Sequence, residues 1–400
     1  AARAGALVCL GSATPSLETW ARARSGRWTW IRLPARVGDR PLPPVRIVDL
    51  REERRRLDAE GGAGSSGPIV LSRALEQALE DCLARGEQAI LLLNRRGYAS
   101  FLQCRACGFV KTCPNCSVSL TYHRRPEHLL CHHCAHTEIV PRACPECGAD
   151  ALAFGGVGTQ HVERVLGERF PAARIARMDL DTTGRKWAHA DILARVERGE
   201  VDILLGTQMI AKGLDFPRVT LVGVIHADVA LHLPDFRASE RTFQLLAQVA
   251  GRAGRGPLGG RVILQTALPD HYALRHAARH DYEGFAEREL REREEPWYPP
   301  HCRLANLLFT SLDEREAADA ALEAARWLRA RIAGAEGGVR AVGPAPAPIP
   351  RIRNRYRWHV LVKAAAPAAL GRLLREFARR PATSRRGVHV EIDRDPASLL

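Results

Sequence analysis

Short, largely apolar runs alternate with amphipathic stretches along most of the chain. A run of four to six apolar residues is typical of a parallel strand that is buried on both faces. We expect strands over residues 6–10, 28–33, 45–50, 89–93, 174–178, 202–205 and 219–224. Because a domain seldom opens on its own central strand, the run at 6–10 also leads us to expect a fragment whose preceding part is absent.

Between these runs, apolar residues recur at helical spacing. The clearest case is positions 71, 75, 79 and 83, which predict a helix over 71–85 that ends at Gly86. Further helices are expected over 17–24, 159–167, 187–198 and 239–253. Strands that alternate with helices build a doubly wound parallel sheet, so the predicted fold class is α/β.

The pattern changes at Trp297. From there on we expect strands over 302–310, 356–363 and 388–392, and helices over 314–332 and 367–379. This order suits a small α+β domain that packs after the larger one.

Eight of the eleven cysteines form four C-x-x-C pairs: Cys104/Cys107, Cys113/Cys116, Cys131/Cys134 and Cys144/Cys147. Eight thiolates are the ligand set for two tetrahedral zinc ions, so we expect two zinc ions per chain. A thioredoxin-like redox motif is a single pair at a helix N-terminus, which disfavours a redox function for four pairs in series. The spacing allows nested or sequential pairing. Cys9, Cys82 and Cys302 lie alone in apolar segments and are expected in the core.

The net charge is +14, and arginine supplies nearly all the positive charge. Such an excess favours a polyanionic partner such as DNA, although arginine enrichment from genome composition is an alternative. The longest apolar stretch, 219–233, is interrupted by His226, Asp228 and His232. We therefore expect no membrane segment and a soluble, cytoplasmic protein of two or three domains.

Arginines alternate with other residues at positions 351, 353, 355 and 357. In an extended strand this period places all four on one face, where they would contact a DNA backbone while Trp358 lies in the core. A solvated strand edge protected by charge is the alternative interpretation.

Three segments carry candidate phosphoryl-transfer chemistry. Ser12-Ala13-Thr14 ends an apolar run, the sequence G-T-Q-M-I-A-K-G at 206–213 follows another, and Q-V-A-G-R-A-G-R at 248–255 closes a predicted helix. Glycines let the main chain approach phosphate groups. Arg252 and Arg255 are spaced to reach one γ-phosphate as arginine fingers.

These segments, in this order, resemble the motifs of superfamily 2 helicases and, within them, the primosomal protein N′ family of replication-restart helicases. The resemblance extends over essentially all 400 residues. It rests on residues 11–18 as motif III, 91–98 as motif IV, 206–216 as motif V, and 235–242 with 248–255 as motif VI. The C-x-x-C insertion directly after motif IV is characteristic of this family among helicases.

The resemblance implies two RecA-like lobes that hydrolyse ATP with Mg²⁺ at their interface and translocate 3′ to 5′ on DNA at abandoned forks. It implies partners: forked and single-stranded DNA, primosome proteins and single-stranded-DNA-binding protein. By motif, Thr207, Gln208, Lys212 and Asp215 would face nucleotide or DNA, and Gln248, Arg252 and Arg255 would complete the ATP site. It also implies nested zinc sites, one held by the outer pairs (Cys104, Cys107, Cys144, Cys147) and one by the inner pairs (Cys113, Cys116, Cys131, Cys134).

One departure from the family pattern affects the function. The 400 residues contain no G-x-x-x-x-G-K-[ST] loop and no D-E-x-H box, which grip the phosphates and Mg²⁺. We therefore expect ATPase activity in the full-length protein and none in this chain alone. A non-catalytic DNA-binding and primosome-scaffolding protein is the main alternative. A zinc-ribbon subunit of transcription machinery would explain the cysteines but not motifs V and VI.

The predicted architecture is therefore a RecA-like parallel sheet, the second helicase lobe, with an inserted two-zinc module and a C-terminal α+β domain. The expected division is as follows: the end of the first lobe at 1–40, the second lobe at 41–100 and 153–296, the zinc insertion at 101–152, and the C-terminal domain at 297–400.

Overall fold

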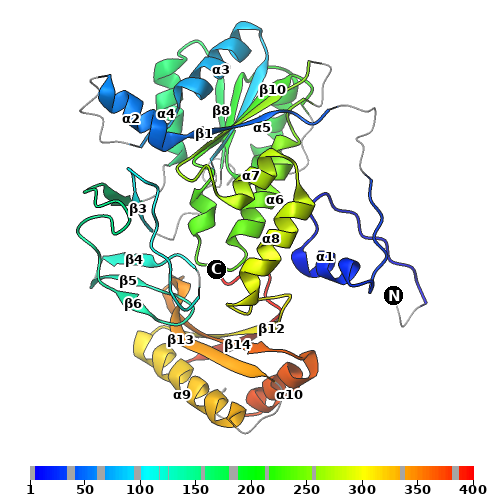
Figure 1. Ribbon diagram of the computed structural model, residues 1–400, viewed down its shortest axis with the longest axis vertical. Helices are drawn as coiled ribbons and strands as arrows, with labels where there is room; N and C mark the ends of the chain where they lie inside the picture. Colours follow the sequence, from blue (N-terminus) through cyan, green and yellow to red (C-terminus); the bar gives the residue numbers. More distant parts are fainter. Residues whose placement is uncertain are drawn as a thin grey trace.

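The computed structural model describes residues 5–33, 41–60, 68–93, 101–116, 118–124, 126–154, 158–179, 188–211, 216–254, 258–333, 338–380 and 387–400. Its largest part is a parallel sheet that helices cover on both sides (Figure 1). The sheet has six strands in the order β1-β11-β10-β2-β9-β8, and each neighbouring pair is parallel. The strands are β1 (Val45–Asp49), β2 (Gln88–Leu93), β8 (Ile175–Met178), β9 (Ile203–Gly206), β10 (Val219–Ile225) and β11 (Arg261–Thr266).

The apolar runs form strands because both faces of this sheet are buried. Along β2, Ile90 and Leu92 enter one core cluster, whereas Leu91 and Leu93 enter the other. The second cluster packs under α3 (Arg73–Ala84) and α4 (Thr159–Arg169). The first packs under four helices: α5 (Ala188–Glu197), α6 (Ala238–Ala250), α7 (Tyr272–Ala278) and α8 (Tyr282–Glu294). Helix α2 (Leu50–Ala59) directly follows β1.

The cysteine-rich insertion lies between β2 and α4. It consists of two small antiparallel sheets. One pairs β3 (Leu102–Cys104) with β7 (Leu152–Phe154), and the other contains β4 (Thr121–Arg124), β5 (Glu127–Leu130) and β6 (Thr137–Glu138).

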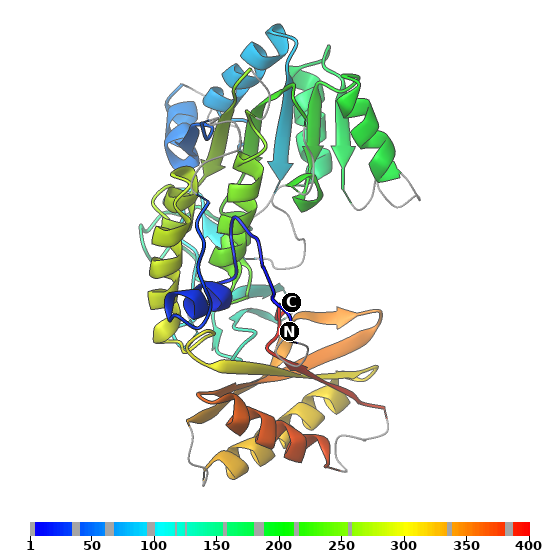
Figure 2. The same cartoon turned by 90° about the vertical axis from the view of Figure 1, so that its right-hand side faces the viewer.

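The C-terminal domain is an antiparallel sheet in the order β13-β14-β12-β15. Both of its helices cover the face that points away from the parallel sheet (Figure 2). The opposite face buries Leu304 and Leu361 against Phe236, Tyr298 and Leu399. The elements are β12 (Arg303–Ser311), α9 (Glu314–Ile332), β13 (Val339–Ile352), β14 (Arg355–Ala364), α10 (Pro367–Ala378) and β15 (His389–Arg394). The predicted fold class is thus confirmed.

The N-terminal segment differs from the prediction. Residues 6–10 and 28–33 form no strand, and their side chains are exposed, with Leu7 96% and Ile31 75% accessible. Cys9 is also exposed, whereas Cys82 and Cys302 are buried as expected. A strand needs a neighbour for its backbone groups, and within the described residues neither run meets one. The predicted helix between them is present as α1 (Leu17–Arg24), which Ser16 caps.

No helix in the described part of the chain is both long and apolar enough to cross a membrane.

Candidate functional site

Motif V lies where β9 leaves the sheet. Gly206 ends the strand, and a Cβ atom there would lie 2.6 Å from the backbone oxygen of Met178, so the close approach to β8 requires glycine. Thr207 follows, and Gln208 opens a short 3₁₀ turn, η2 (Gln208–Ala211). Both side chains are half-buried at the carboxyl edge of the sheet. Lys212 and Asp215 fall outside the described residues.

Motif VI forms the end of α6 and the turn after it. Gln248 is exposed on α6, the helix ends at Ala250, and half-buried Arg252 follows. The helix contacts η2, so the elements that carry motifs V and VI are neighbours. Gly254 has a φ of 68°, in the left-handed region that favours glycine, and it lets the chain turn back toward β11. Arg255 falls outside the described residues, so its distance to Arg252 stays a prediction.

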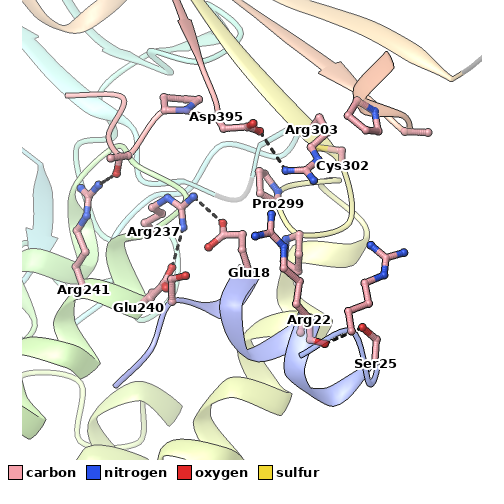
Figure 3. A pocket seen from close by; sticks show the side chains of 18 of the residues that line it. Glu18, Arg22, Ser25, Arg237, Glu240, Arg241, Pro299, Cys302, Arg303 and Asp395 are labelled. Carbon is pink, nitrogen blue, oxygen red and sulfur yellow. Dashed lines mark hydrogen bonds and ion pairs between the residues drawn. The ribbon is translucent and has the colours of Figure 1, made fainter. Parts of the chain in front are cut away.

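Motif III contacts the start of motif VI directly. The backbone amide of Leu17 donates to Oε1 of Glu240 at 3.0 Å, and Arg237 forms an ion pair with Glu18 at 2.6 Å. Figure 3 shows Arg237 between the two carboxylates. The side-chain amide of Gln244 also donates, through Nε2, to the backbone carbonyl of Thr14 at 3.4 Å. Two motifs more than 200 residues apart are therefore joined by charged and backbone hydrogen bonds.

A buried charge network continues from this contact into α8. Arg293 donates to Glu240 and to Glu289, at 2.8 Å and 2.9 Å, and Glu289 accepts from the hydroxyl of Tyr272. Burial disfavours the charge of Glu18, but the hydrogen bond and charge of Arg237 outweigh it and leave the pKa of Glu18 below its usual value. Burial raises the pKa of Glu289. Removal of one member of the network would destabilise the fold, because its partner would be left as a buried charge without water or a counter-charge.

A cavity of about 880 Å³ lies beside this network, between α1, the start of α6 and the C-terminal domain. Side chains of both signs line it, among them Glu18, Arg22, Arg237, Arg241, Arg303 and Asp395 (Figure 3). None of the described motif residues Thr207, Gln208, Gln248 and Arg252 lines it, so the cavity is separate from the candidate nucleotide site.

The eight cysteines of the C-x-x-C pairs gather into two groups of four. The outer pairs meet, with Cys104 Sγ 3.7 Å from Cys147 Sγ and Cys107 Sγ 3.6 Å from Cys144 Sγ. The inner pairs meet likewise, with Cys113 Sγ 3.7 Å from Cys134 Sγ. In each group all four sulfur atoms lie within 4.8 Å of one another. The structure thus has the nested arrangement and not the sequential one.

Both groups suit zinc. Four cysteine sulfurs converging on one point are the donor set of a closed, structural tetrahedral site, which leaves no position for a substrate. Each C-x-x-C turn directs backbone amides toward its sulfurs, as where His133 N donates to Cys131 Sγ at 3.4 Å. The donor chemistry therefore fits two structural metal ions.

Two histidines inside the Cys131–Cys134 turn, here called the inner knuckle, connect it to the rest of the protein. His132 Nδ1 lies 2.9 Å from the carbonyl of Pro346 in the C-terminal domain. His133 lies between Tyr298, whose hydroxyl is 2.7 Å from Nδ1, and the carbonyl of Pro234, 3.2 Å from Nε2. We predicted no role for these histidines from the sequence. Their signal was the presence of two histidines in a metal-binding turn where small or polar residues suffice.

The arginine segment is a hairpin and not one strand. Arg351 is the last residue but one of β13, Arg353 lies in the turn, and Arg355 and Arg357 lie in the first three residues of β14. Arg353 and Asn354 have φ angles of 48° and 63°, as in a type I′ turn, whose twist matches the strands on either side. The prediction of four arginines on one strand face was therefore wrong, because the turn falls in the middle of the run. Trp358 packs against the core of the domain, as expected.

The hairpin arginines differ in their exposure to solvent and in their bonding partners. Arg351, Arg353 and Arg355 are exposed and form no ion pair with a carboxylate of the described residues. Arg351 lies over the ring of Tyr356, 4.9 Å from its centroid. Arg357 instead is half-buried and donates to the carbonyl of Ile349 at 3.0 Å. Three cations at the tip, not four along a strand, are thus exposed to an anionic partner.

Buried His232 gives the parallel-sheet part a defined pH dependence. Burial lowers the pKa of His232 to about 4 from 6.5, although Asp228 favours its protonated form. The unfolded chain therefore takes up a proton near pH 6.5 and the folded chain only near pH 4. The stabilisation that comes from the neutral ring is therefore complete above pH 6.5. As the pH falls from 6.5 to about 4, the free energy of unfolding decreases by on the order of 3 kcal/mol.

We expect the free energy of unfolding of His232→Gln to depend less steeply on pH in this window than that of the unchanged chain. Urea unfolding from about pH 7 to about pH 4.5 measures it. His389→Gln, at an exposed position, is the matched control and should keep the original slope. Equal slopes in the His232 variant and the unchanged chain would contradict the assignment.

A parallel sheet with motif V at the end of β9 and motif VI along α6 and the turn after it defines the class of protein, a helicase-type RecA-like lobe. Residues 158–257 match the family described as "Helicase conserved C-terminal domain". Residues 113–138 match "PriA DNA helicase Cys-rich region (CRR) domain", and residues 294–397 match "Primosomal protein N C-terminal domain".

Full-length relatives agree with these matches. The chain is 45% identical over 395 residues to the replication restart protein PriA of Bacillus subtilis, covering 98% of this chain and 48% of that protein. It is 43% identical over 400 residues to that of Synechocystis sp., covering 98% and 46%. The chain belongs to the PriA family of replication restart proteins. It spans about half the length of these relatives.

Proposed function

We propose that this chain, joined to a complete first lobe, works as an ATP-dependent helicase. It would translocate 3′ to 5′ on DNA, recognise stalled or abandoned replication forks and initiate primosome assembly. The observation that carries the proposal is the direct contact of motif III with motif VI through Leu17, Glu18, Arg237 and Glu240. Since motif III would belong to the first lobe, this contact would join that lobe to the helix that carries motif VI.

We propose the following division of work at the nucleotide site. Gln248, Arg252 and Arg255 act from the second lobe on the γ-phosphate, and Thr207, Gln208, Lys212 and Asp215 face nucleotide or DNA. When bound, ATP would supply the phosphoryl group and Mg²⁺ the charge neutralisation for its transfer. The 400 residues contain no loop that grips the β-phosphate, so the chain supplies one side of the site.

The two groups of cysteines would each hold one zinc ion with a structural role. Cys104, Cys107, Cys144 and Cys147 form one site, and Cys113, Cys116, Cys131 and Cys134 form the other. Forked and single-stranded DNA, primosome proteins and single-stranded-DNA-binding protein are the proposed partners, and they follow from family membership.

Unwinding of forks with a defined polarity tests the proposal. A protein in which this chain is joined to a complete first lobe, here called the longer protein, should unwind a fork with ATP when the strand on which it loads has a free 3′ end. It should leave a fork of the opposite polarity intact. Fork binding without ATP hydrolysis would contradict it and favour a scaffolding protein.

We propose the hairpin tip as a DNA-binding element. Replacing Arg351, Arg353 and Arg355 together by alanine should weaken DNA binding by this chain. It should also flatten the dependence of log affinity on log salt concentration, by about 0.7 to 0.9 for each phosphate that the chain no longer neutralises. Fluorescence anisotropy over a salt series measures both quantities.

The matched control replaces Arg372, Arg375 and Arg379, three exposed arginines on α10 and directly after it. It removes the same charge and should leave the slope closer to that of the unchanged chain. An equal effect of both triple variants would mean that only net charge matters and that the hairpin is a solvated edge.

A further inference from the structure

Three consecutive residues, Asp235-Phe236-Arg237, contact three parts of the protein that are distant in sequence. Asp235 accepts from the hydroxyl of Ser398 and the amide of Leu399, both at 3.2 Å, after the last strand of the C-terminal domain. Phe236 stacks on Tyr298, with ring centroids 4.7 Å apart and an interplanar angle of 4°. Arg237 forms the ion pair with Glu18 of motif III. We call these three residues the junction segment.

The junction segment fixes the guanidinium of Arg237 from two sides. The group lies 4.7 Å from the centroid of the Phe236 ring, and its nitrogens reach the carboxylates of Glu18 and Glu240. Arg293 lies 5.2 Å from the centroid of the same ring and also binds Glu240. A shift of the Phe236 ring therefore moves both cations that hold Glu240, the acceptor for the amide of Leu17.

Contacts on the other side of the ring lead to the C-terminal domain and the inner knuckle. The hydroxyl of Tyr298 is paired with His133, and Lys363 of β14 lies 3.6 Å from the centroid of the Tyr298 ring. His133 also reaches the carbonyl of Pro234, the residue before the junction segment. The knuckle thus contacts the backbone directly before the segment and reaches Phe236 through the Tyr298 stack. Asp235 and Tyr298 are both nearly inaccessible to water. Water therefore does not replace the contacts of Asp235 with Ser398 and Leu399, or the contact of Tyr298 with His133.

We propose that the junction segment sets the position of motif III against motif VI according to how the C-terminal domain and the inner knuckle are docked, with Phe236 and Tyr298 as positioning residues. This structural coupling does not depend on the proposed function. Its consequence for catalysis does depend on it: DNA held by the C-terminal domain would change the geometry in which the two lobes meet.

Two backbone amides report on the two ends of the junction. The amide of Leu17 donates to Glu240 at the motif III end, and that of Leu399 donates to Asp235 at the C-terminal end. Both residues are buried. Tyr298→Leu, which touches no residue of motif III, should speed hydrogen exchange at Leu17 by at least about threefold. Glu18→Gln should speed exchange at Leu399, because coupling between two sites is reciprocal.

The double variant separates coupling from two independent local effects. If the ends are coupled, the change in exchange of Glu18→Gln with Tyr298→Leu should depart from the product of the single changes by about threefold or more, as for residues of one network. The proposal is overturned if the change in exchange of the double variant equals the product of the single changes within error. It is also overturned if Tyr298→Leu leaves exchange at Leu17 unchanged and Glu18→Gln leaves exchange at Leu399 unchanged. Measuring this in the 400-residue chain separates its failure from a failure of the helicase assignment, which only unwinding assays test.

Matched controls are available for both changes. Tyr356→Leu removes a tyrosine on the hairpin, and Glu323→Gln removes a partly exposed partner of Arg380 in the C-terminal domain. Neither should alter Leu17 or Leu399. Amides of β2, which belong to the sheet core, should exchange as in the unchanged chain and so report intact folding. If Tyr298→Leu does not fold, Tyr298→Phe removes only the hydroxyl from His133 and should shift Leu17 in the same direction, and no shift there overturns the proposal.

Discussion

ATP turnover of the longer protein should fall by roughly 10³-fold or more when Arg255 is replaced by alanine, as for loss of an arginine finger. The physical reason is the charge that develops on the transferred phosphoryl group, which a second-lobe cation offsets only in the transition state. DNA binding in the absence of nucleotide should change much less. Steady-state hydrolysis with and without fork DNA, together with anisotropy of labelled DNA, measures both effects.

Arg279→Ala is the matched control, because Arg279 is exposed at the end of α7 in the same lobe. It should keep near-normal turnover. The 400-residue chain alone should show no DNA-stimulated hydrolysis, since it contains no phosphate-gripping loop. Near-normal turnover by Arg255→Ala would remove its assigned role, and hydrolysis by the chain alone would place the nucleotide elsewhere.

Removal of one cysteine of the inner group should have the second large effect. The purified chain should contain two zinc ions, and Cys131→Ala should lower this toward one. Structural zinc contributes on the order of 10 kcal/mol to small modules. The insertion should therefore lose its fold around the inner knuckle while the parallel sheet stays intact. Metal analysis together with circular dichroism before and after chelation measures both outcomes.

Two controls make the zinc experiment specific. Cys9→Ala, at an exposed cysteine outside both groups, should keep two zinc ions. Cys147→Ala should remove the outer ion but leave the contacts of His133 with Tyr298 and Pro234, so only the inner variant should loosen the C-terminal domain. Zero or one zinc ion in the freshly reduced, unaltered chain would refute the two-site prediction.

Sequence patterns predicted the helices and strands whose buried face can be read from the spacing of apolar residues within the segment itself. The run at 89–93 appears as β2 because alternate leucines and isoleucines meet helices on both faces, and the helix expected over 314–332 has those bounds in α9. The segment 28–33 is also largely apolar, yet it forms no strand, because a strand also needs a neighbour. An apolar pattern alone thus does not suffice to predict a strand, because the strand also needs a neighbouring strand.

Other elements lacked a local signal. We did not predict β11, α7 or α8, and β13 carries prolines at 344, 346, 348 and 350, which usually argue against a strand. Here β13 lies at the edge of its sheet, where missing amide donors are tolerated. The junction of Glu18, Arg237 and Tyr298 could not be predicted either, because it joins residues that only the tertiary fold brings together. Motif order identified the segments of the site but not their contacts.

The nested arrangement of the cysteines favours one order of assembly. The inner group closes a loop between positions 21 apart in sequence, whereas the outer group closes one between positions 43 apart that contains it. Loop-closure entropy rises with the logarithm of loop length, so the smaller loop closes at lower cost. Once it has closed, the chain left free between the outer cysteines is shorter, and the second closure is easier than the first would have been alone. Loop-closure entropy therefore favours closure of the inner site before the outer one.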